Sequence, residues 1–445
     1  MARPFVPGSP GHVLYNVALG AAIVAGAPFW IPWVLLSRKR RGNFPDRLGL
    51  RRGPGPRPPG DGPTVWVHAV SVGETIASAP LLRRLRERAP TARLLLSNVT
   101  ITGHGTAEKT LSGTTDGRFY FPFDLPGLCG WFLDRVRPDV VVVVETEIWP
   151  NFLAACAHRK IPVVIVNGRL SERSFRGYSR LRWFFGPVLL TLRAISAQTR
   201  QDADRFLAVG ADPGIVTVGG NLKFDVSPPE GKPTPLTELL EREKAAGTRW
   251  IVAGSTHDGE ELLVLRSFLA ARAVDPALRL LLAPRHPERF AEVESLLRQE
   301  GIPAARRTGI PEGGDRLDRD VLILDTVGEL ASAYAAADLA FVGGSLVPKG
   351  GHNVLEPAWH GVPTVVGPHM ENFREIADAF LAAKALLQVT GERELSALVS
   401  RFAASPRSFR EVGRKARELL TEFRGASERN ATVVLSAMSR RGGPR

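Results

Sequence analysis

The stretch GGHNVLEPAWHGVP, residues 350–363, has the pattern of a turn, helix and strand in an α/β domain. It follows the apolar run 339–342 and a pair of glycines, and it precedes the apolar run 364–366. This order predicts a short helix after a glycine-rich turn, and the unpaired N–H groups at a helix start bind phosphate well. Glu356, just inside the predicted helix, is placed to accept hydrogen bonds from ribose hydroxyls. The stretch therefore predicts a nucleotide-sugar site on an α/β domain.

The length and composition suit a two-domain protein of a reducing compartment. The chain has 445 residues, of which 44% are hydrophobic, enough for large cores. Only two cysteines occur, Cys129 and Cys156, so we expect no disulfide framework. The net charge of +13 favours an anionic partner or surface.

The N-terminal region carries a long uncharged segment. Residues 13–36 include no charged side chain over 24 positions, which is enough for a helix to span a bilayer. Four basic residues follow at 38–41, and such residues accumulate on the cytoplasmic side. We therefore expect a transmembrane anchor at 1–37 with the remainder in the cytoplasm. A helix lying in the membrane interface is the alternative.

The rest of the chain alternates short apolar runs with helical periodicity. Continuous runs such as VVVVV at 140–144 are typical of strands buried on both faces, which predicts parallel sheets covered by helices. Expected strands are 64–69, 93–98, 140–144, 162–166, 250–253, 280–283, 321–324, 339–342 and 364–366. The expected divisions are a basic Pro/Gly-rich linker at 38–63, a Rossmann-like domain at 64–224, a hinge at 225–247, a second Rossmann-like domain at 248–405, and a C-terminal helix and tail at 406–445 that crosses back to the first domain.

Carboxylates follow two strands of the first domain. Glu74 comes after the strand at 64–69, where it could act as a general base or simply complement the dipole of the helix it begins. Glu145 and Glu147 come after the most hydrophobic strand, where buried carboxylates are costly unless paired or functional. Either could position an acceptor or a cationic partner, or cap a backbone turn.

A basic and aromatic stretch lies at 174–193. Its arginines alternate with five aromatic side chains, which suits a membrane surface with anionic headgroups. An ordinary core helix with solvated arginines is an equal alternative. Nucleic-acid binding is disfavoured, because no nucleic-acid module accompanies the stretch.

Further loops of the second domain follow predicted strands, at 253–261, 284–287 and 325–330. Arg285 supplies a forked donor suited to phosphate or carboxylate. Together with 350–358, these loops meet at one edge of the predicted sheet and indicate a nucleotide site. Lys223, at the end of the first domain, could reach a leaving phosphate or a sugar carboxylate, or it could simply be a solvated side chain.

Other chemistries find little support in the sequence. The pairs Asp202/Asp204 and Asp318/Asp320 lie in a predicted helix and before a strand, so neither resembles a metal loop. The nine histidines form no zinc-binding pattern. Neither a dinucleotide fingerprint in the first βα unit nor a nucleophile elbow occurs.

A set of motifs is spread along the chain: SVGET (71–75), FPFDLP (121–126), ETEIWPN (145–151), GNLKFD (220–225), STHDGEE (255–261), PRHPERF (284–290), FVGGSL (341–346) and GGHNVLEPA (350–358). Together these motifs resemble the 3-deoxy-D-manno-octulosonic acid (Kdo) transferases of lipopolysaccharide synthesis. The resemblance implies a GT-B fold with two Rossmann-like domains facing across a cleft, and an anchor in the bacterial inner membrane.

The resemblance also implies a reaction and its residues. The enzyme would move Kdo from CMP-Kdo to lipid IVA with inversion and without metal or other cofactor. Glu74 would be the general base, and Glu145 and Lys223 would support the transition state. The implied CMP contacts are Pro284, Arg285, Val327, Gly328, Glu329, Asn353, Val354, Leu355 and Glu356.

Two further interpretations remain open from the sequence. One is a GT-B enzyme that transfers a sugar from a UDP donor to a lipid, and competition between CMP and UDP would distinguish it. The other is a membrane-anchored binding protein that keeps the fold without turnover.

Overall fold

The computed structural model describes residues 5–36, 42–51, 54–56, 62–226, 234–310 and 317–439. The basic run at 38–41, other parts of the expected linker and residues 227–233 of the expected hinge lie outside this part of the chain. The chain divides into two compact units, Met1–Val226 with Phe423–Arg445 (unit 1) and Ser227–Glu422 (unit 2).

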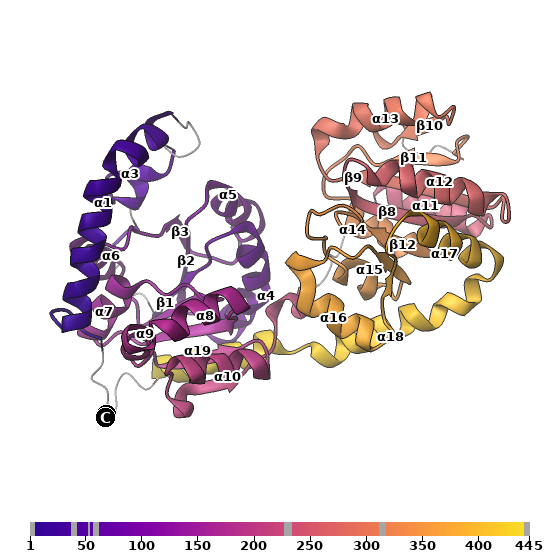
Figure 1. The fold of residues 1–445 in the computed structure, drawn as a ribbon. Helices are drawn as coiled ribbons and strands as arrows, with labels where there is room; N and C mark the ends of the chain where they lie inside the picture. The colour runs from indigo at the N-terminus through magenta and orange to yellow at the C-terminus, as the bar shows by residue number, and fades with distance from the viewer. Residues whose placement is uncertain are drawn as a thin grey trace. The chain divides into compact units, whose positions relative to one another are not determined.

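Unit 1 is built on a seven-stranded parallel sheet in the order β3-β2-β1-β4-β5-β6-β7 (Figure 1). Its strands are β1 (Thr64–His68), β2 (Arg93–Asn98), β3 (Gly117–Tyr120), β4 (Val140–Val144), β5 (Val163–Gly168), β6 (Ala194–Ala197) and β7 (Val216–Val218). Successive valines of β4 point into apolar clusters on opposite faces of the sheet. The prediction of a parallel sheet covered on both faces is therefore confirmed.

Helices cover both faces of this sheet, and α1 packs outside them against α7. The helices and turns of unit 1 are α1 (Pro10–Leu36), α3 (Phe44–Arg47), α4 (Val72–Arg88), α5 (Ile101–Thr110), α6 (Pro126–Val136), α7 (Pro150–His158), α8 (Glu172–Arg180), α9 (Arg182–Leu189), α10 (Arg200–Val209), the 3-10 turns η1 (Pro213–Ile215) and η2 (Leu222–Asp225), and α19 (Ala426–Ser439). Helix α19 returns from the far end of the chain and packs on α4 and β5. Asp225 holds its start, accepting the N–H groups of Gly425 at 2.8 Å and Ser427 at 2.5 Å.

Unit 2 repeats this architecture with a second seven-stranded parallel sheet, in the order β10-β11-β9-β8-β12-β13-β14. The strands are β8 (Arg249–Thr256), β9 (Leu278–Pro284), β10 (Ala304–Arg306), β11 (Val321–Ile323), β12 (Leu339–Val342), β13 (Thr364–Val366) and β14 (Leu387–Gln388). The helices are α11 (Pro235–Ala245), α12 (Glu260–Arg272), α13 (Phe290–Gln299), α14 (Leu330–Ala336), α15 (Leu355–Trp359), α16 (Arg374–Ala382), α17 (Glu392–Ala404) and α18 (Arg410–Phe423), with the 3-10 turns η3 (Pro287–Arg289), η4 (Arg307–Gly309), η5 (Glu371–Phe373) and η6 (Pro406–Phe409).

Each sheet has one place where the chain winds away in opposite directions from two adjacent strands. In unit 1 these strands are β1 and β4, and in unit 2 they are β8 and β12. Ligands of such sheets bind beyond the carboxyl ends of the strands at this point. The loops that carry most of the predicted site residues begin there or at a neighbouring strand.

The structure differs from the expected boundaries in two places. Residues 235–245 of the expected hinge form α11, whose leucines Leu236, Leu239 and Leu240 are buried in unit 2. The expected single C-terminal helix is two helices, α18 and α19, separated near Gly425. That glycine has a φ of 88°, a left-handed conformation that ends a helix.

Candidate active site

Glu74 lies in the first turn of α4, directly beyond β1. Its two carboxylate oxygens accept from the N–H of Val70 at 2.7 Å and the hydroxyl of Ser71 at 2.8 Å. Ser71 caps α4 and accepts in turn from the N–H of Glu74 at 3.4 Å, an arrangement close to a capping box. Burial nevertheless raises the pKa of Glu74, and the charge of Glu145 adds to the rise. Glu74 therefore both helps to begin the helix and is a more basic carboxylate than usual.

Glu145 and Glu147 gather beside Glu74, beyond the end of β4. Glu145 has a φ of 63°, a backbone conformation that non-glycine residues adopt rarely and that clusters at functional sites. Burial raises the pKa of Glu147 to about 7, and the charges of Glu74 and Glu145 contribute to the rise. Like charges in a partly buried site oppose one another's ionisation. The edge at β1 and β4 therefore holds three neighbouring carboxylates, and the pKa of one of them, Glu147, is about 7.

Lys223 lies in η2, a turn that packs against α4. Its backbone N–H donates to Oδ1 of Asn221 at 3.0 Å. The preceding N–H, of Leu222, donates to Oδ1 of Asn167 at 2.9 Å, and Asn167 lies in β5 next to β4. The half-buried Lys223 is thus carried on a segment fixed to both the sheet and the helix that begins with Glu74.

In unit 2, two glycines stand where the ends of β8 and β12 leave no room for a side chain. A Cβ atom on Gly254 would lie 2.0 Å from the hydroxyl oxygen of Tyr334 in α14, and one on Gly343 would lie 2.5 Å from the carbonyl oxygen of Ser255. The strands pair here directly, through a bond of 2.9 Å from the N–H of Gly343 to the carbonyl of Gly254. Because β11, β9, β8 and β12 are neighbours in one parallel sheet, the loops after them emerge at one edge, as predicted.

Glu260 occupies the backbone donors of the turn after β12. Its buried carboxylate accepts the N–H groups of Gly344 at 2.7 Å, Ser345 at 3.0 Å, Leu346 at 2.9 Å and His257 at 2.9 Å. These four N–H groups are consequently not available to a ligand. Helix α15 spans only five residues. A phosphate group at this edge would therefore depend on side chains more than on these amides.

Three histidines gather at the same edge. The Nε2 atoms of His257 and His352 lie 2.8 Å apart, with the two rings in parallel planes. The ring of His286 lies 5.4 Å from that of His257, centroid to centroid. Burial lowers the pKa of His352 to about 4, and the nearby Arg285 contributes. The pair is therefore neutral near pH 7, with one ring donating its N–H to the other.

Arg285 and Glu356 complete this group. The guanidinium of Arg285 forms no ion pair with any described residue, and its side chain is exposed. Burial raises the pKa of Glu356, which Arg285 opposes, so the two side chains lie near each other. Glu356 also accepts from Nδ2 of Asn353 at 3.1 Å. The predicted residues of the 350–358 loop and of the PRHPERF motif are thus brought together.

The loop at 327–329 extends the edge towards β11. Val327 is 83% exposed, an unusual position for an apolar side chain, and Gly328 has a φ of 99°. The carboxylate of Glu329 accepts from the hydroxyl of Thr326 at 2.5 Å and from Arg307 at 3.3 Å. The loop therefore offers an exposed apolar side chain beside a fixed carboxylate.

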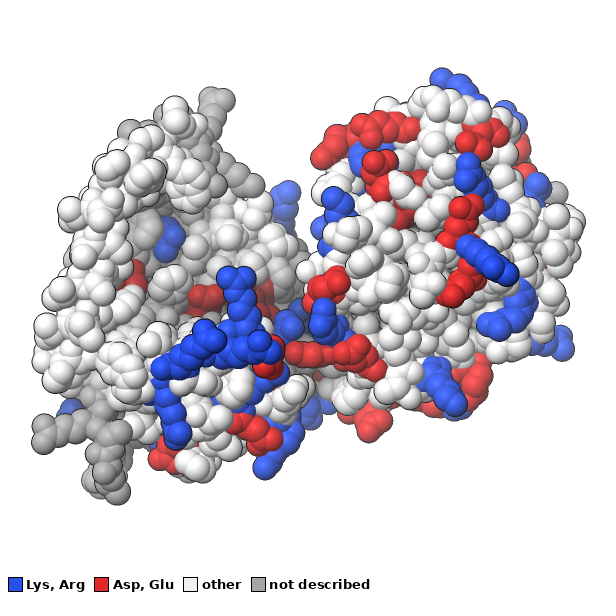
Figure 2. Space-filling view, in the orientation of Figure 1, with Lys and Arg blue, Asp and Glu red and all other residues white. Residues whose placement is uncertain are grey.

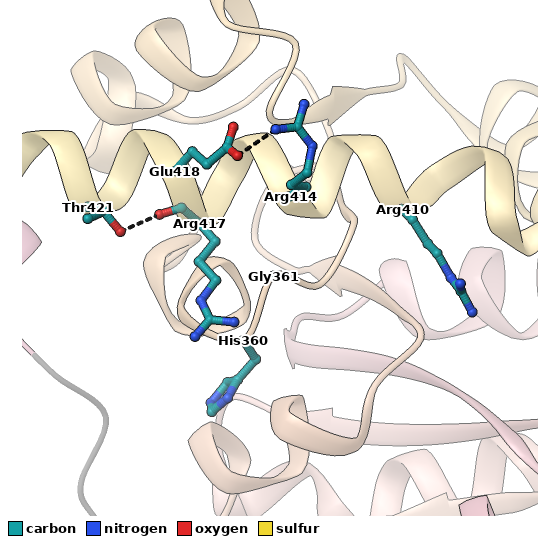
Figure 3. Close-up of a pocket in the computed structure, with 7 residues that line it drawn as sticks. All are labelled: His360, Gly361, Arg410, Arg414, Arg417, Glu418 and Thr421. Carbon is teal, nitrogen blue, oxygen red and sulfur yellow. Dashed lines mark hydrogen bonds and ion pairs between the residues drawn. The ribbon is translucent and has the colours of Figure 1, made fainter.

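A pocket of about 550 Å³ lies elsewhere in unit 2, between α18 and the end of α15. Figure 3 shows Arg417 and His360 directed to the same side of α18, while Arg414 is paired with Glu418. None of the predicted donor-binding residues lines this pocket.

Glu260, His257 and His352 were not predicted individually. Glu260 and Ser345 are 85 positions apart, so their hydrogen bond leaves no local trace. The available signal was that both glycine-rich motifs, STHDGEE and GGHNVLEPA, carry a histidine as their third residue. Glu147 was named only as an alternative to Glu145. Its raised pKa depends on burial and on the charges of Glu74 and Glu145, which come together only in the folded protein.

Residues 42–226 match the family model of 3-deoxy-D-manno-octulosonic-acid transferase. The 3-deoxy-D-manno-octulosonic acid transferase of Haemophilus influenzae is 35% identical over 383 residues, covering 84% of this chain and 86% of that protein. The protein of the same name from Bordetella pertussis is 35% identical over 438 residues, 95% of this chain and 99% of its own length. Among solved structures, Anabaena Alr3699/HepE in complex with UDP has a TM-score of 0.55 at 14% identity, covering 85% of this chain and all of that chain (100%).

The structural likeness shows the fold, which is GT-B, as the motifs implied. The sequence relatives show more, because they are similar over both units and nearly the whole chain. The chain belongs to the Kdo transferase family, the glycosyltransferases that transfer Kdo in lipopolysaccharide biosynthesis.

Proposed function

We propose that this chain transfers Kdo from CMP-Kdo to the lipid A precursor lipid IVA and releases CMP. Transfer inverts the anomeric carbon and uses neither a metal ion nor another cofactor. The observation that carries the proposal is the carboxylate cluster beyond β1 and β4, where burial makes Glu74 a stronger base than an ordinary glutamate. A base of this kind must lie within hydrogen-bond reach of the hydroxyl that it deprotonates.

Glu74 takes the proton of an acceptor sugar hydroxyl, and the hydroxyl oxygen forms the new bond to the anomeric carbon of Kdo. The bond from that carbon to the phosphate oxygen breaks, and its electron pair leaves with CMP. By analogy with glycoside chemistry, positive charge builds on the sugar ring as the bond to the phosphate oxygen breaks and before the new bond is complete. Glu145 is suited to stabilise that charge, and Lys223 to meet the negative charge of the phosphate or of the Kdo carboxylate.

The donor half of the reaction belongs to unit 2. Arg285 has no competing ion pair among the described residues, so its fork is available to the CMP phosphate. The neutral His257–His352 pair has one N–H that is not used between the rings, and could donate it to the same phosphate. Pro284, Glu329 and the segment from Asn353 to Glu356 are assigned to the nucleoside.

The remaining contacts are assigned to the base and to the turn. Exposed Val327 offers an apolar surface to cytosine, and Gly328 permits the backbone to turn beside it. In Asn353-Val354-Leu355-Glu356, the apolar side chains Val354 and Leu355 are buried, so they anchor the loop while the polar ones face the ribose. Fixed charges and donors of this kind stabilise a developing phosphate charge without reorganisation.

We assign the protein to the cytoplasmic face of the bacterial inner membrane. Helix α1 is long and apolar enough to cross a membrane, and four basic residues follow it. Lysine and arginine accumulate on the cytoplasmic side of membrane segments, so both units are assigned to that side. An acceptor that carries phosphates on an anionic membrane suits the net charge of +13.

The test is to incubate detergent-solubilised protein with lipid IVA and fresh CMP-Kdo in the presence of EDTA. Mass spectrometry of the acceptor should show the gain of one Kdo, and further increments would count additional transfers. An intact acceptor, with a known Kdo transferase active in parallel, would refute the proposal. Competition between CMP and UDP would then test a UDP-sugar donor, and CMP binding without turnover would indicate a binding protein.

A further inference from the structure

Helix α1 is attached to unit 1 at its N-terminal end. Phe5, just before the helix, is 2% exposed and belongs to the apolar cluster beneath the sheet. Its backbone N–H donates to the carbonyl of Pro187 at 3.1 Å, and its ring meets that of Phe184 edge-on at 5.3 Å. The chain before α1 is therefore part of the folded unit.

Two polar side chains in the first turns of α1 continue this attachment. The hydroxyl of Tyr15 donates to Oδ2 of Asp124 at 2.9 Å. Asn16 and Asn151 exchange a reciprocal pair of amide hydrogen bonds, at 2.8 and 2.9 Å. Asp124 and Asn151 are 8% and 1% exposed. The motifs FPFDLP and ETEIWPN, to which they belong, thus position α1, a role that the proposed reaction does not use.

The segment after α1 is attached to the same unit. The ring of Trp30, in the last turns of α1, stacks on that of Phe44 at 6.5 Å. Nearby, the amide of Asn43 donates to the carbonyl of Val99 at 2.7 Å, and Arg47 donates to the carbonyl of Phe121 at 3.0 Å. Both ends of α1 are therefore held by unit 1.

Between these attachments, α1 presents an apolar surface that no described residue covers. Residues 20–25 are all exposed, and Val17, Val24, Phe29 and Leu36 are 65%, 75%, 80% and 85% exposed. Figure 2 shows the helix as an uncharged surface along one side of unit 1. If this apolar surface were exposed to water, it would favour aggregation. In a membrane, lipid acyl chains would cover it.

Charge beside the helix identifies the surface that it meets. Helices α8 and α9 pack their aromatic rings into unit 1, including Phe184 against Phe5 and Tyr15. Their arginines and Trp183 are exposed, and Figure 2 shows the basic side chains over α8. Both alternatives for the stretch at 174–193 therefore have support. The rings are core, and although Arg176 pairs with Glu172 at 3.1 Å, the exposed arginines give this surface a positive charge that suits anionic headgroups.

We propose that α1 lies along the cytoplasmic interface of the membrane, with both of its ends on the same side, and does not cross the bilayer. A crossing helix of 27 residues, about 40 Å long, would separate residues 5–16 from residues 42–51 by the whole membrane. Both segments are bonded to one unit, so a crossing would pull Phe5 from the core and leave Asp124 and Asn151 buried without these partners. The inference rests on the membrane location in the proposed function, but not on the reaction.

The absence of charge around α1 is consistent with this position. A helix on the surface of a soluble protein needs one polar face, but a helix that contacts protein on one side and acyl chains on the other does not. Exposed Trp33 and Trp183 suit the headgroup boundary, where indole rings concentrate.

The test is labelling of single engineered cysteines with a membrane-impermeant maleimide. The two native cysteines are buried, so their background should be low. Pro7→Cys, before α1, and the control Lys109→Cys, on α5, are both at exposed positions. In intact spheroplasts, with a periplasmic cysteine protein labelled in parallel, neither should react. After the inner membrane is opened, both should react.

Labelling of Pro7→Cys in intact spheroplasts, with Lys109→Cys protected, would overturn the inference in favour of a crossing helix. Labelling of both in detergent shows that each thiol is reactive, so protection in spheroplasts has a single meaning. Recovery of the protein in the soluble fraction would instead refute the membrane location, independently of the acceptor assay.

Discussion

Replacement of Glu74 separates its two roles, because the carboxylate is both the cap partner of α4 and the proposed base. Glu74→Gln keeps the size of the side chain and one acceptor oxygen for Val70 or Ser71. It cannot take a proton from the acceptor hydroxyl. Loss of a general base costs about 10²–10⁴-fold in rate, or about 3–5.5 kcal/mol in the barrier. We expect transfer to fall by about that factor.

The stability effect of the same change should be much smaller. Loss of a helix cap costs about 1 kcal/mol, and in a unit of this size 1 kcal/mol moves the melting temperature by about 2–4 °C. CMP binding should be unchanged, because Glu74 is not among the residues proposed to contact CMP. Glu74→Ala should also abolish transfer, with a somewhat larger loss of stability.

The assay measures initial rates of Kdo transfer to lipid IVA by mass spectrometry, with calorimetric titration of CMP and thermal unfolding on the same preparations. Ser71→Ala is the matched control, since it removes the hydroxyl that caps α4 but leaves the carboxylate. It should lower stability by about as much as Glu74→Gln, about 1 kcal/mol, and retain most of the activity. Transfer by Glu74→Gln within about tenfold of the unaltered rate would refute the general-base role. Loss of CMP binding would show that Glu74 is structural.

Three further predictions concern the other groups of the site. Burial raises the pKa of Glu147 to about 7, so the folded state keeps a proton that the unfolded chain releases near pH 4.5. Unit 1 should therefore lose stability as the pH rises between these two values. In denaturant titrations, the stability of Glu147→Gln should depend less on pH over this range than that of the unaltered protein. An unchanged slope would contradict the cluster. In Glu260→Gln, an NH2 group that cannot accept a hydrogen bond replaces one carboxylate oxygen, so two of the four backbone N–H groups lose their acceptor. Chemical denaturation should show unit 2 destabilised by about 3 kcal/mol or more. A change under about 1 kcal/mol would show that other contacts hold the turn. Arg285→Lys keeps the charge but loses the fork, and should weaken CMP binding about tenfold at constant salt in calorimetry; equal affinity would remove Arg285 from the phosphate site.

Most of the inner strands could be predicted from the sequence. The inner strand β6 and the four edge strands β3, β7, β10 and β14 were not among the expected strands. Runs such as 140–144 are continuously apolar because helices cover both faces of the sheet, and this leaves a direct mark on composition. The edge strands β7, β10 and β14 are only two or three residues long and mostly half-buried or exposed, so they carry little apolar signal. Their backbone pairing exists only because a neighbouring strand is already in place.

The candidate site shows the same division. Glycines and carboxylates directly after apolar runs could be located by local pattern, since the end of each strand is a local event. The pKa of Glu147 and the contact of His257 with His352 could not, because each depends on groups from different loops. The pairing of Glu260 with the turn after β12 also joins segments far apart in the chain.

Helix α1 shows most clearly which properties depend on the sequence alone and which depend on the tertiary structure. Its length and lack of charge are properties of 24 consecutive residues, and they predict a membrane segment without any structure. Whether it crosses or lies along the bilayer depends on bonds such as Tyr15 to Asp124, which join residues 109 positions apart. The free energy of transferring a helix into an apolar phase is approximately a sum over its residues, so it can be judged from the sequence. The direction of the helix depends on which surface of the folded unit holds its two ends, and that surface exists only after the sheet has assembled.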